Sequence, residues 1–132
     1  MLYYMHRNSM HLDPMLVVKG VIHMKISKEL LKGSTGTMVL QLLSEQDMYG
    51  YMIIQQIDSR SDSVFRMSEG SLYPILHAME KDGLLEAYRQ VSDSGKERKY
   101  YRITAKGRMQ LNLKLDEWKL FSSSVSKVLG HE

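Results

Sequence analysis

The chain contains no cysteine and only two prolines in 132 residues. Without cysteine it can form no disulfide, no thiolate metal site and no cysteine nucleophile, so a reducing cytoplasm is the expected compartment. No apolar run approaches the roughly 20 residues that a membrane-spanning helix needs. The apolar residues 15–24 are interrupted by Lys19 and His23 and lack the charged-then-apolar order of a signal peptide. We therefore expect no membrane partner.

An excess of one charge sign is also nearly absent, because 18 basic residues face 15 acidic ones and the net charge is only +3. The charges are unevenly placed, however. Residues 44–83 carry a net charge of −4, whereas residues 88–102 carry +3. The basic residues of the second stretch are Arg89, Lys96, Arg98, Lys99 and Arg102, set against Asp93 and Glu97. A local basic cluster of this kind favours a nucleic-acid partner.

Patterns typical of enzymes and metal sites are missing. The histidines show no pairing at ligand spacing; they are His6, His11, His23, His77 and His131. Glu80 and Asp82 lie two residues apart on an expected helix, so their carboxylates point in different directions and make a poor acid–base pair. The glycines at positions 33 and 36 lack the lysine of a phosphate-binding loop. We expect no catalysis, no metal and no cofactor.

Three helical patterns follow one another between residues 34 and 82. The first begins at Ser34 or Thr35 and ends near residues 45–47, and the second begins around residues 49–51 and ends in the polar run 58–63. The third is capped by Ser68, runs to Asp82 and stops at Gly83. Its buried stripe consists of Leu72, Ile75, Leu76 and Met79, at i, i+3, i+4 and i+7.

The opposite face of the third helix is small and neutral near its start. It carries Gly70, Pro74, His77 and Lys81, flanked by Ser71 and Tyr73. A start near Ser71 would put Pro74 in the first turn, where a missing N–H costs little. Another surface can approach the backbone closely at this face.

A β-hairpin is predicted next, with strands over residues 84–91 and 99–103 joined by the turn 92–95. Three helices followed by a two-stranded ribbon with a basic tip form a winged helix-turn-helix. In that architecture the third helix enters the DNA major groove and the wing contacts the flanking backbone. The expected fold is mainly α with a small β-hairpin.

A long C-terminal helix, capped by Thr104, completes the pattern. Apolar and small residues recur along it at alternating steps of four and three, at Leu111, Leu115, Trp118, Ser122, Val125 and Leu129. Little of the preceding domain is available to cover this seam, so we expect it to pack against a second copy of the chain. The alternative is a helix that lies back on the first three. Leu113, Leu120 and Phe121 widen the apolar surface and offer a contact with a partner's first helix.

Several short motifs, in this order, resemble the PadR-like transcriptional regulators. They are the residues 49–51 (Tyr-Gly-Tyr), 70–74 (Gly-Ser-Leu-Tyr-Pro), Leu76 with Glu80, 83–85 (Gly-Leu-Leu), 98–101 (Arg-Lys-Tyr-Tyr) and Thr104 with Gly107. The resemblance covers roughly residues 28–129 and departs at Met52, where an acidic residue is frequent, and at Met79, where leucine is usual. It implies a homodimeric bacterial repressor of the shorter branch of the family, with small-molecule control common.

On this interpretation the DNA-binding residues are Tyr51, Ser71, Tyr73, His77, Lys81, Lys96, Arg98 and Lys99. The resemblance favours a phosphate contact for the hydroxyl of Tyr73, against a half-buried packing role. His77 either contacts a base edge or is solvated. Trp118 is either a dimer anchor or, with Ser122, part of a cavity for a planar aromatic effector.

The expected organisation is an N-terminal extension over residues 1–26, a winged-helix domain over 27–103 and a dimerisation helix over 104–132. Met24 is a plausible start, so residues 1–23 are either an upstream extension outside the fold or a genuine flexible arm. The competing function is a winged-helix adaptor that binds protein and has no specific affinity for DNA.

Overall fold

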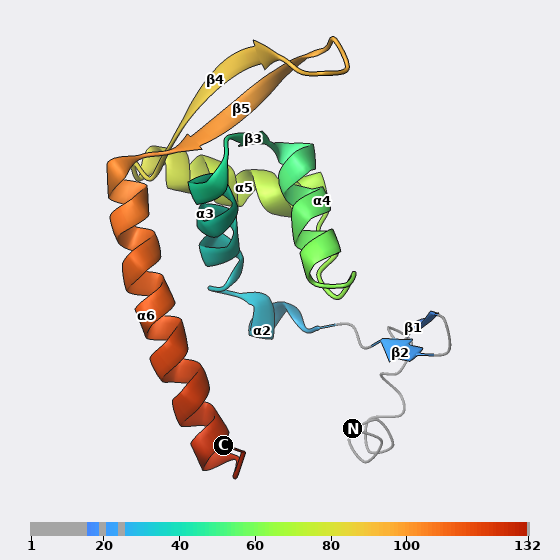
Figure 1. The fold of residues 1–132 in the computed structure, drawn as a ribbon, viewed down its shortest axis with the longest axis vertical. Helices are drawn as coiled ribbons and strands as arrows, with labels where there is room; N and C mark the ends of the chain where they lie inside the picture. The colour runs from blue at the N-terminus through green and yellow to red at the C-terminus, as the bar shows by residue number, and fades with distance from the viewer. Residues whose placement is uncertain (1–15, 19–20, 24–25, 132) are drawn as a thin grey trace.

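A computed structural model describes the backbone of residues 16–18 and 21–23 and the whole of residues 26–131. The helices are α2 (Lys28–Leu31), α3 (Thr35–Glu45), α4 (Gly50–Arg60), α5 (Glu69–Lys81) and α6 (Ala105–Val128); the strands are β1 (Leu16–Val18), β2 (Val21–His23), β3 (Met48–Tyr49), β4 (Leu85–Val91) and β5 (Glu97–Ile103). The helices α3, α4 and α5 lie on one side of the β3–β5 sheet, and α6 extends away from it (Figure 1). This confirms the expected winged helix-turn-helix with a long C-terminal helix.

The sheet is antiparallel, with the strand order β3-β5-β4. Tyr88 pairs with Tyr100 in the hairpin, and Met48 of β3 pairs with Tyr101 on the other side of β5. Gly95 supplies the positive φ (+87°) that the hairpin turn requires. Sequence reasoning missed β3, because its two residues directly precede α4 and are too few to show an alternating pattern.

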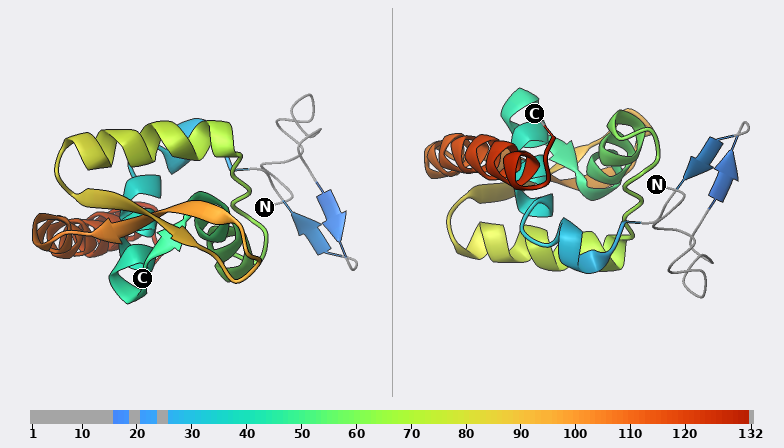
Figure 2. Two further views of the ribbon diagram at one scale, coloured as in Figure 1. Left: turned by 90° about the horizontal axis from the view of Figure 1, so that it is seen from above. Right: turned by 90° about the horizontal axis from the view of Figure 1, so that it is seen from below.

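The core lies between the three helices and β5. Its most completely buried side chains come from α3, α4, α5 and β5, and they are Val39, Leu43, Ile53, Leu72, Leu76 and Tyr101. The predicted stripe of α5 is therefore in the core, with Met79 buried and Ile75 half-buried. Seen from above, α5 lies along one side of the sheet while α6 leaves the head at another (Figure 2).

The start of α5 follows the predicted Ser68 cap and not the alternative start near Ser71. The helix begins at Glu69, with Ser68 as its N-cap, so Pro74 lies inside the helix beyond the first turn. A proline there removes one hydrogen bond and crowds the carbonyl four residues earlier. That carbonyl belongs to Gly70, which is exposed to solvent. Water can therefore satisfy the carbonyl oxygen of Gly70.

The N-terminal prediction is only partly covered by the described residues. Within the predicted extension, β1 and β2 pair as an antiparallel ladder with Val17 opposite Ile22. The sequence has no periodicity there that predicted these two strands. The proposed start at Met24 lies outside the described residues. Among the helices that the structure describes, none combines the length and the apolar character needed to cross a bilayer.

Candidate nucleic-acid interface

A hollow of about 400 Å³ lies between the first turns of α4 and α5 and the strand β5. Its lining combines tyrosines with charged side chains: Tyr49, Tyr51, Glu69, Tyr73, Glu97, Arg98 and Lys99. Four of the predicted DNA-binding residues, from three separate elements, thus meet at one place. Tyr49, Glu69 and Glu97 were not predicted, although each lies within two residues of a predicted one.

The exposed face of α5 adjoins this hollow. Ser71, His77 and Lys81, all predicted, are exposed along it together with Gly70 and Pro74. The hydroxyl of Ser68 accepts a hydrogen bond from the backbone N–H of Ser71 (3.2 Å) and donates to the Ser71 hydroxyl (3.1 Å). The cap therefore fixes the first turn of α5 and leaves its outer face clear for another molecule.

Tyr73 is half-buried and has a packing role. Its hydroxyl presses on Gly50 at the start of α4, where an added Cβ would lie only 2.7 Å from the oxygen. Burial, followed by the negative charge of Glu69, raises the pKa of the Tyr73 hydroxyl. The hydroxyl stays protonated and can donate. Its contact with phosphate remains a prediction, and the packing alternative is present in the structure as well.

Arg98 is held by an aromatic ring. Its guanidinium carbon lies 5.1 Å from the ring centroid of Tyr49, a cation–π distance. In the described part of the chain, its Nε is buried without a hydrogen-bond partner. The ring thus holds Arg98 in place at the lining of the hollow, whereas Nε itself is covered by the protein.

The other wing cations differ in their freedom. Lys99 lies 3.7 Å from the carboxylate of Glu80 on α5, Arg89 lies 3.9 Å from Glu97, and Arg102 contacts Asp47 and Glu86. Among the five wing cations, only Lys96 and Arg98 have no acidic partner in residues 26–131. The net charge of +3 counted for residues 88–102 therefore overstates the positive charge available to a partner, because Glu80, Asp47 and Glu86 also face these cations.

The outer face of the sheet carries a cluster that sequence reasoning did not identify. Tyr100 stacks on Tyr88 (5.7 Å between ring centroids) and meets the edge of Tyr49 (5.3 Å). The Tyr88 hydroxyl donates to Asp47 (2.5 Å), and this hydrogen bond raises the pKa of Tyr88. Strand alternation, which places residues 98, 100 and 102 on one face, was the available signal. The cluster joins β3 firmly to the wing.

The long helix α6 corrects one predicted dimer contact. Leu111 is only 5% exposed and packs in the core of its own head, and Leu115 is half-buried against it. Leu111 thus has almost no surface left for a partner, because α3 already covers the first turns of α6. Farther along, Trp118 (53%), Val125 (38%) and Leu129 (66%) are exposed. The alternative in which the helix lies back on the head describes the first turns of α6, and packing of the remainder against a second copy stays a prediction.

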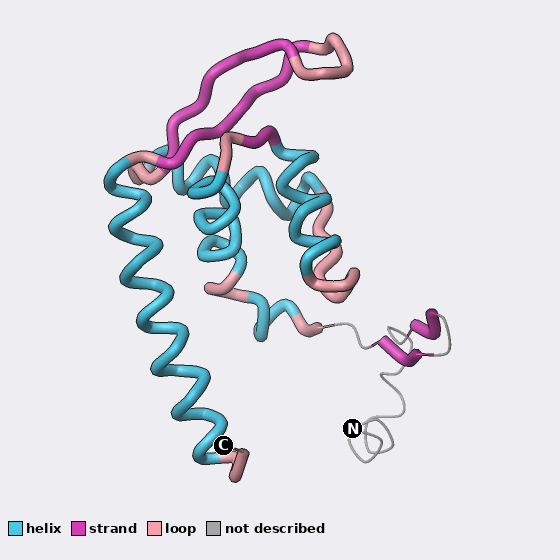
Figure 3. Tube along the Cα trace, in the orientation of Figure 1, coloured by secondary structure: helices cyan, strands magenta, loops and turns pink. Residues whose placement is uncertain are grey.

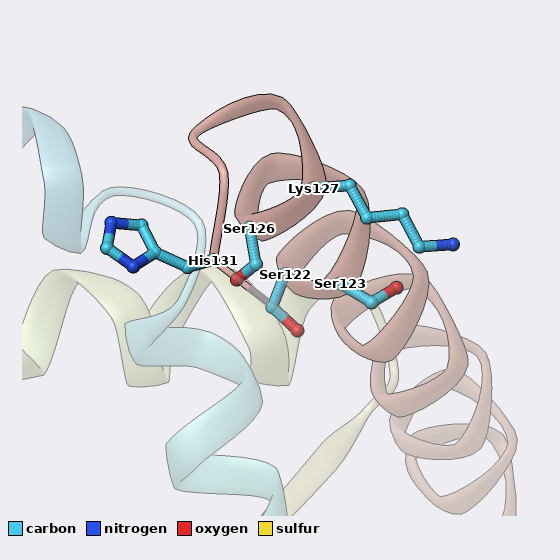
Figure 4. A pocket seen from close by; sticks show the side chains of 5 residues that line it. All are labelled: Ser122, Ser123, Ser126, Lys127 and His131. Atoms are coloured by element: carbon cyan, nitrogen blue, oxygen red, sulfur yellow. The ribbon is translucent and has the colours of Figure 1, made fainter.

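The predicted effector residues do not form one cavity in the single chain. A hollow of about 210 Å³ near the end of α6 is lined by Ser122, Ser123, Ser126, Lys127 and His131, without Trp118. Lys127 and His131 extend to opposite sides of the helix end (Figure 4). The ring of Trp118 instead lies 6.3 Å from that of Phe121. An effector site at Trp118 remains a prediction.

Groups of three or more potential metal ligands are absent from the part of the chain that the structure describes. The hollow between α4, α5 and β5 has lysine, arginine and glutamate as its charged residues and no histidine or cysteine in its lining. This donor set fits an anion contacted by basic side chains better than it fits a transition metal.

Comparisons with known proteins agree with this geometry. A sequence model described as the transcriptional regulator PadR-like family matches residues 39–113. An uncharacterized protein of Lysinibacillus sphaericus is 39% identical over 94 residues, covering 70% of this chain and 85% of the relative. The transcriptional regulator Rv3488 of Mycobacterium tuberculosis is 32% identical over 84 residues, covering 64% and 75%. The crystal structure of the PadR-like transcriptional regulator BC4206 from Bacillus cereus superposes with a TM-score of 0.70 at 34% identity, covering 80% and 100%.

Proposed function

Because the chain belongs to the PadR-like family of transcriptional regulators, we propose that it acts as a homodimeric, ligand-responsive repressor that binds double-stranded operator DNA. The recognition element is α5, and the backbone contact is the wing, meaning β4, β5 and their turn (residues 85–103). The observation that carries the proposal is the exposed face of α5 beside the hollow that holds Arg98.

The shape of α5 supports entry into the major groove. Its 13 residues span about 20 Å at 1.5 Å per residue, and a B-DNA major groove about 12 Å wide admits such a helix. Gly70 has no side chain and Pro74 has only a short ring, so no long side chain projects from the exposed face near its start. The backbone of α5 can therefore come close to the base edges. His77, one turn further on, has ring nitrogens that can exchange hydrogen bonds with a base.

The chemistry of the hollow supports contact with the phosphate backbone. Arg98 supplies a planar fork of donors, and Tyr51 and Tyr73 supply hydroxyls. The carboxylates of Glu69 and Glu97 repel phosphate and confine it to the side of Arg98. Lys96 adds a cation at the wing turn, where it is exposed. Since residues 44–83 carry a net −4, the wing supplies most of the attraction.

The exposed surface of α6 supports a dimer. Trp118, Val125 and Leu129 lie on the stripe that continues from Leu111, whereas Met109, Leu113 and Leu120 lie on nearly the opposite side and are 66–70% exposed. A helix that is apolar on two sides needs cover on both. A second copy of the chain offers its own α6 for one side and its head for the other.

The aromatic pair on α6 supports an effector site within that dimer. Trp118 and Phe121 lie on neighbouring sides of the helix with their rings tilted by 34°. Two copies of this pair, brought together by the dimer, form flat apolar walls for a planar aromatic compound. Because Trp118 is the sole tryptophan, its fluorescence reports binding directly. A panel of planar dyes that quenches it supports the site; no response across the panel contradicts it.

The DNA proposal is tested by titrating the protein against labelled DNA from upstream of its own coding sequence, at salt concentrations from about 50 to 200 mM. If Lys96 and Arg98 of both protomers contact phosphates, log K falls with log salt. Four contacts at −0.9 each give a slope of about −3.6 or steeper. A competitor of random sequence separates specific from general affinity. Absence of salt-dependent binding contradicts the proposal and favours the protein-binding adaptor.

A further inference from the structure

The end of the recognition helix is bound by the beginning of the long helix. The chain leaves α5 through Gly83 (φ +80°), with Leu84 N–H bonded to the carbonyl of Met79 (2.9 Å) and Gly83 N–H to that of Glu80 (3.1 Å). These two bonds are the pair that closes a helix end of the Schellman type. The carbonyls of residues 82, 83 and 84 then point outward and need other donors.

All three carbonyls are taken by the first residues around the start of α6. The Thr104 hydroxyl donates to the carbonyl of Gly83 (2.7 Å), and the Thr104 N–H donates to that of Leu84 (3.0 Å). Lys106 Nζ donates to the carbonyl of Asp82 (2.7 Å). The two loops concerned lie side by side where α5 ends and α6 begins (Figure 3).

Thr104 serves both helices with one hydroxyl. While it donates to Gly83, its oxygen accepts the N–H of Gly107 (3.0 Å) as the N-cap of α6. The cap of one helix is therefore also the anchor of the other. A change in the direction of α6 alters the geometry of both hydrogen bonds at once.

Lys106 is the longer of the two connections. Its stem crosses Gly83, where a side chain would meet the Lys106 Cδ at 3.7 Å, and its ammonium lies at the carbonyl end of α5. A positive charge is favourable there, because the helix dipole places partial negative charge at that end. Lys106 thus donates its hydrogen bond to a main-chain carbonyl at the end of α5, whose position is fixed by the helix, and not to a carboxylate on a rotatable side chain.

We propose that Lys106 is a positioning residue for DNA binding: it fixes the angle between α5 and α6 and so sets where the recognition helix lies in a dimer joined through α6. This inference rests on the proposed function. The lever is long, since α5 spans about 20 Å and a rotation of about 10° at its end moves its first turn by about 3 Å. Such a shift exceeds the few tenths of an ångström that hydrogen bonds to DNA tolerate.

The angle is measured without DNA by introducing two spin labels. The chain has no cysteine, so Ala78→Cys on α5 and Asn112→Cys on α6, both at exposed positions, can be labelled specifically. An excess of unlabelled protein leaves one labelled protomer in each dimer. We expect a narrow distance distribution in the parent and a broadened or shifted one in Lys106→Met. An unchanged distribution overturns the proposal, whatever the DNA affinity.

DNA affinity is then compared among three variants. Lys106→Met should bind operator DNA about tenfold more weakly, and Lys106→Arg, whose guanidinium can reach the same carbonyl, should restore most of the affinity. The matched control is Arg108→Met, which removes the same charge two residues away; Arg108 reaches the carbonyl of Ser44 on α3 at 3.5 Å and not α5. We expect a change of less than twofold for this control.

The salt dependence separates positioning from direct contact. If Lys106 only positions α5, the slope of log K against log salt is the same in Lys106→Met and in the parent. A slope reduced by about 0.9 per protomer means that Lys106 itself touches phosphate and overturns the inference. Equal losses in Lys106→Met and Arg108→Met also overturn it. If the parent itself shows no salt-dependent affinity for DNA, the proposed function fails, and the spin-label result still decides the angle.

Discussion

Gly107 in the first turns of α6 lies directly against the main-chain carbonyl of Leu84. A Cβ added to Gly107 would fall 2.2 Å from that oxygen and 2.7 Å from the Cγ1 of Ile103. The same oxygen accepts the N–H of Thr104. The absence of a side chain at position 107 thus allows the long helix to lie against the base of the hairpin. A side chain there would meet a backbone oxygen, which cannot move aside as the end of a flexible side chain could.

Gly107→Ala should therefore destabilise the protein strongly. Overpacking a rigid site costs about 1–3 kcal/mol, and here a backbone atom must move, so we expect a loss of at least about 2 kcal/mol in the free energy of unfolding. Urea denaturation followed by circular dichroism measures it. The control is Gly36→Ala on α3, where the nearest atom, Met79 Sδ, is 3.8 Å away. That variant should be stabilised by about 0.4–1 kcal/mol. Equal stability of the two variants would refute the close-packing account.

An exposed ion pair gives the head a pH-dependent contribution. Arg60 holds Glu45 by two contacts (2.6 and 3.0 Å) that join the ends of α3 and α4. The hydrogen bonds from Arg60, and then from Gln41, lower the pKa of Glu45 from 4.5 to about 2. A lowered carboxyl pKa adds stability that is complete above about pH 4.5 and is lost as the pH falls towards about 2.

Glu45→Gln should remove this contribution. We expect the melting temperature of the parent to fall more steeply than that of the variant between about pH 4.5 and pH 2, because only the parent has this carboxylate to protonate. The difference should be small and should shrink in high salt, since both side chains are 39–48% exposed. Parallel melting curves across this range would show that the pair contributes nothing.

Much of the head was predictable because local signals and burial agree there. The caps at Ser68 and Thr104, the glycine stop at Gly83 and the hairpin turn all lie where the sequence indicated. Their residue types are those that each backbone conformation needs, so short-range chemistry was sufficient. At α5 the Ser68 cap was the correct signal for the helix start, and the alternative start near Ser71, which would have put Pro74 in the first turn, does not occur.

Contacts between distant segments were not predictable in the same way. For Tyr73 the sequence left two roles open, a phosphate contact and half-buried packing, and its packing on Gly50 depends on how α4 meets α5. Leu111 continued a regular seam, and nothing in its spacing showed where α3 stops covering it. For the wing, the sequence gives the number of charges but does not show that Glu80 on α5 lies beside Lys99. Each of these depends on tertiary packing.

The wing prediction can now be narrowed to two cations. We expect Lys96→Gln with Arg98→Gln to weaken operator binding and to reduce the slope of log K against log salt by about 3.6 in the dimer, four charges at 0.9 each. Arg102→Gln should change the slope less, because Arg102 already contacts Asp47 and Glu86. Fluorescence anisotropy at several salt concentrations measures both.

The control for this pair is Lys127→Gln, an exposed cation near the end of α6. It lies about 30 Å along the helix from Gly107, at 1.5 Å per residue, and should leave the slope unchanged. If Lys127→Gln lowers the slope as much as the wing variants do, the affinity follows total charge and not the wing.

The two parts of α6 should respond differently to substitution. Leu111→Ala leaves a cavity in the head and should lower the free energy of unfolding by about 2–5 kcal/mol without separating the protomers.

Trp118→Asp places a charge on the exposed stripe and should give a monomer by light scattering, with the helical spectrum of the head retained. Asn112→Asp, which adds the same charge at another exposed position of α6, should remain dimeric. The melting temperature of the parent should rise with concentration, as it does when a dimer dissociates on unfolding. A Trp118→Asp protein that stays dimeric would place the interface elsewhere, because a buried unpaired carboxylate in an apolar seam costs more than such a seam tolerates.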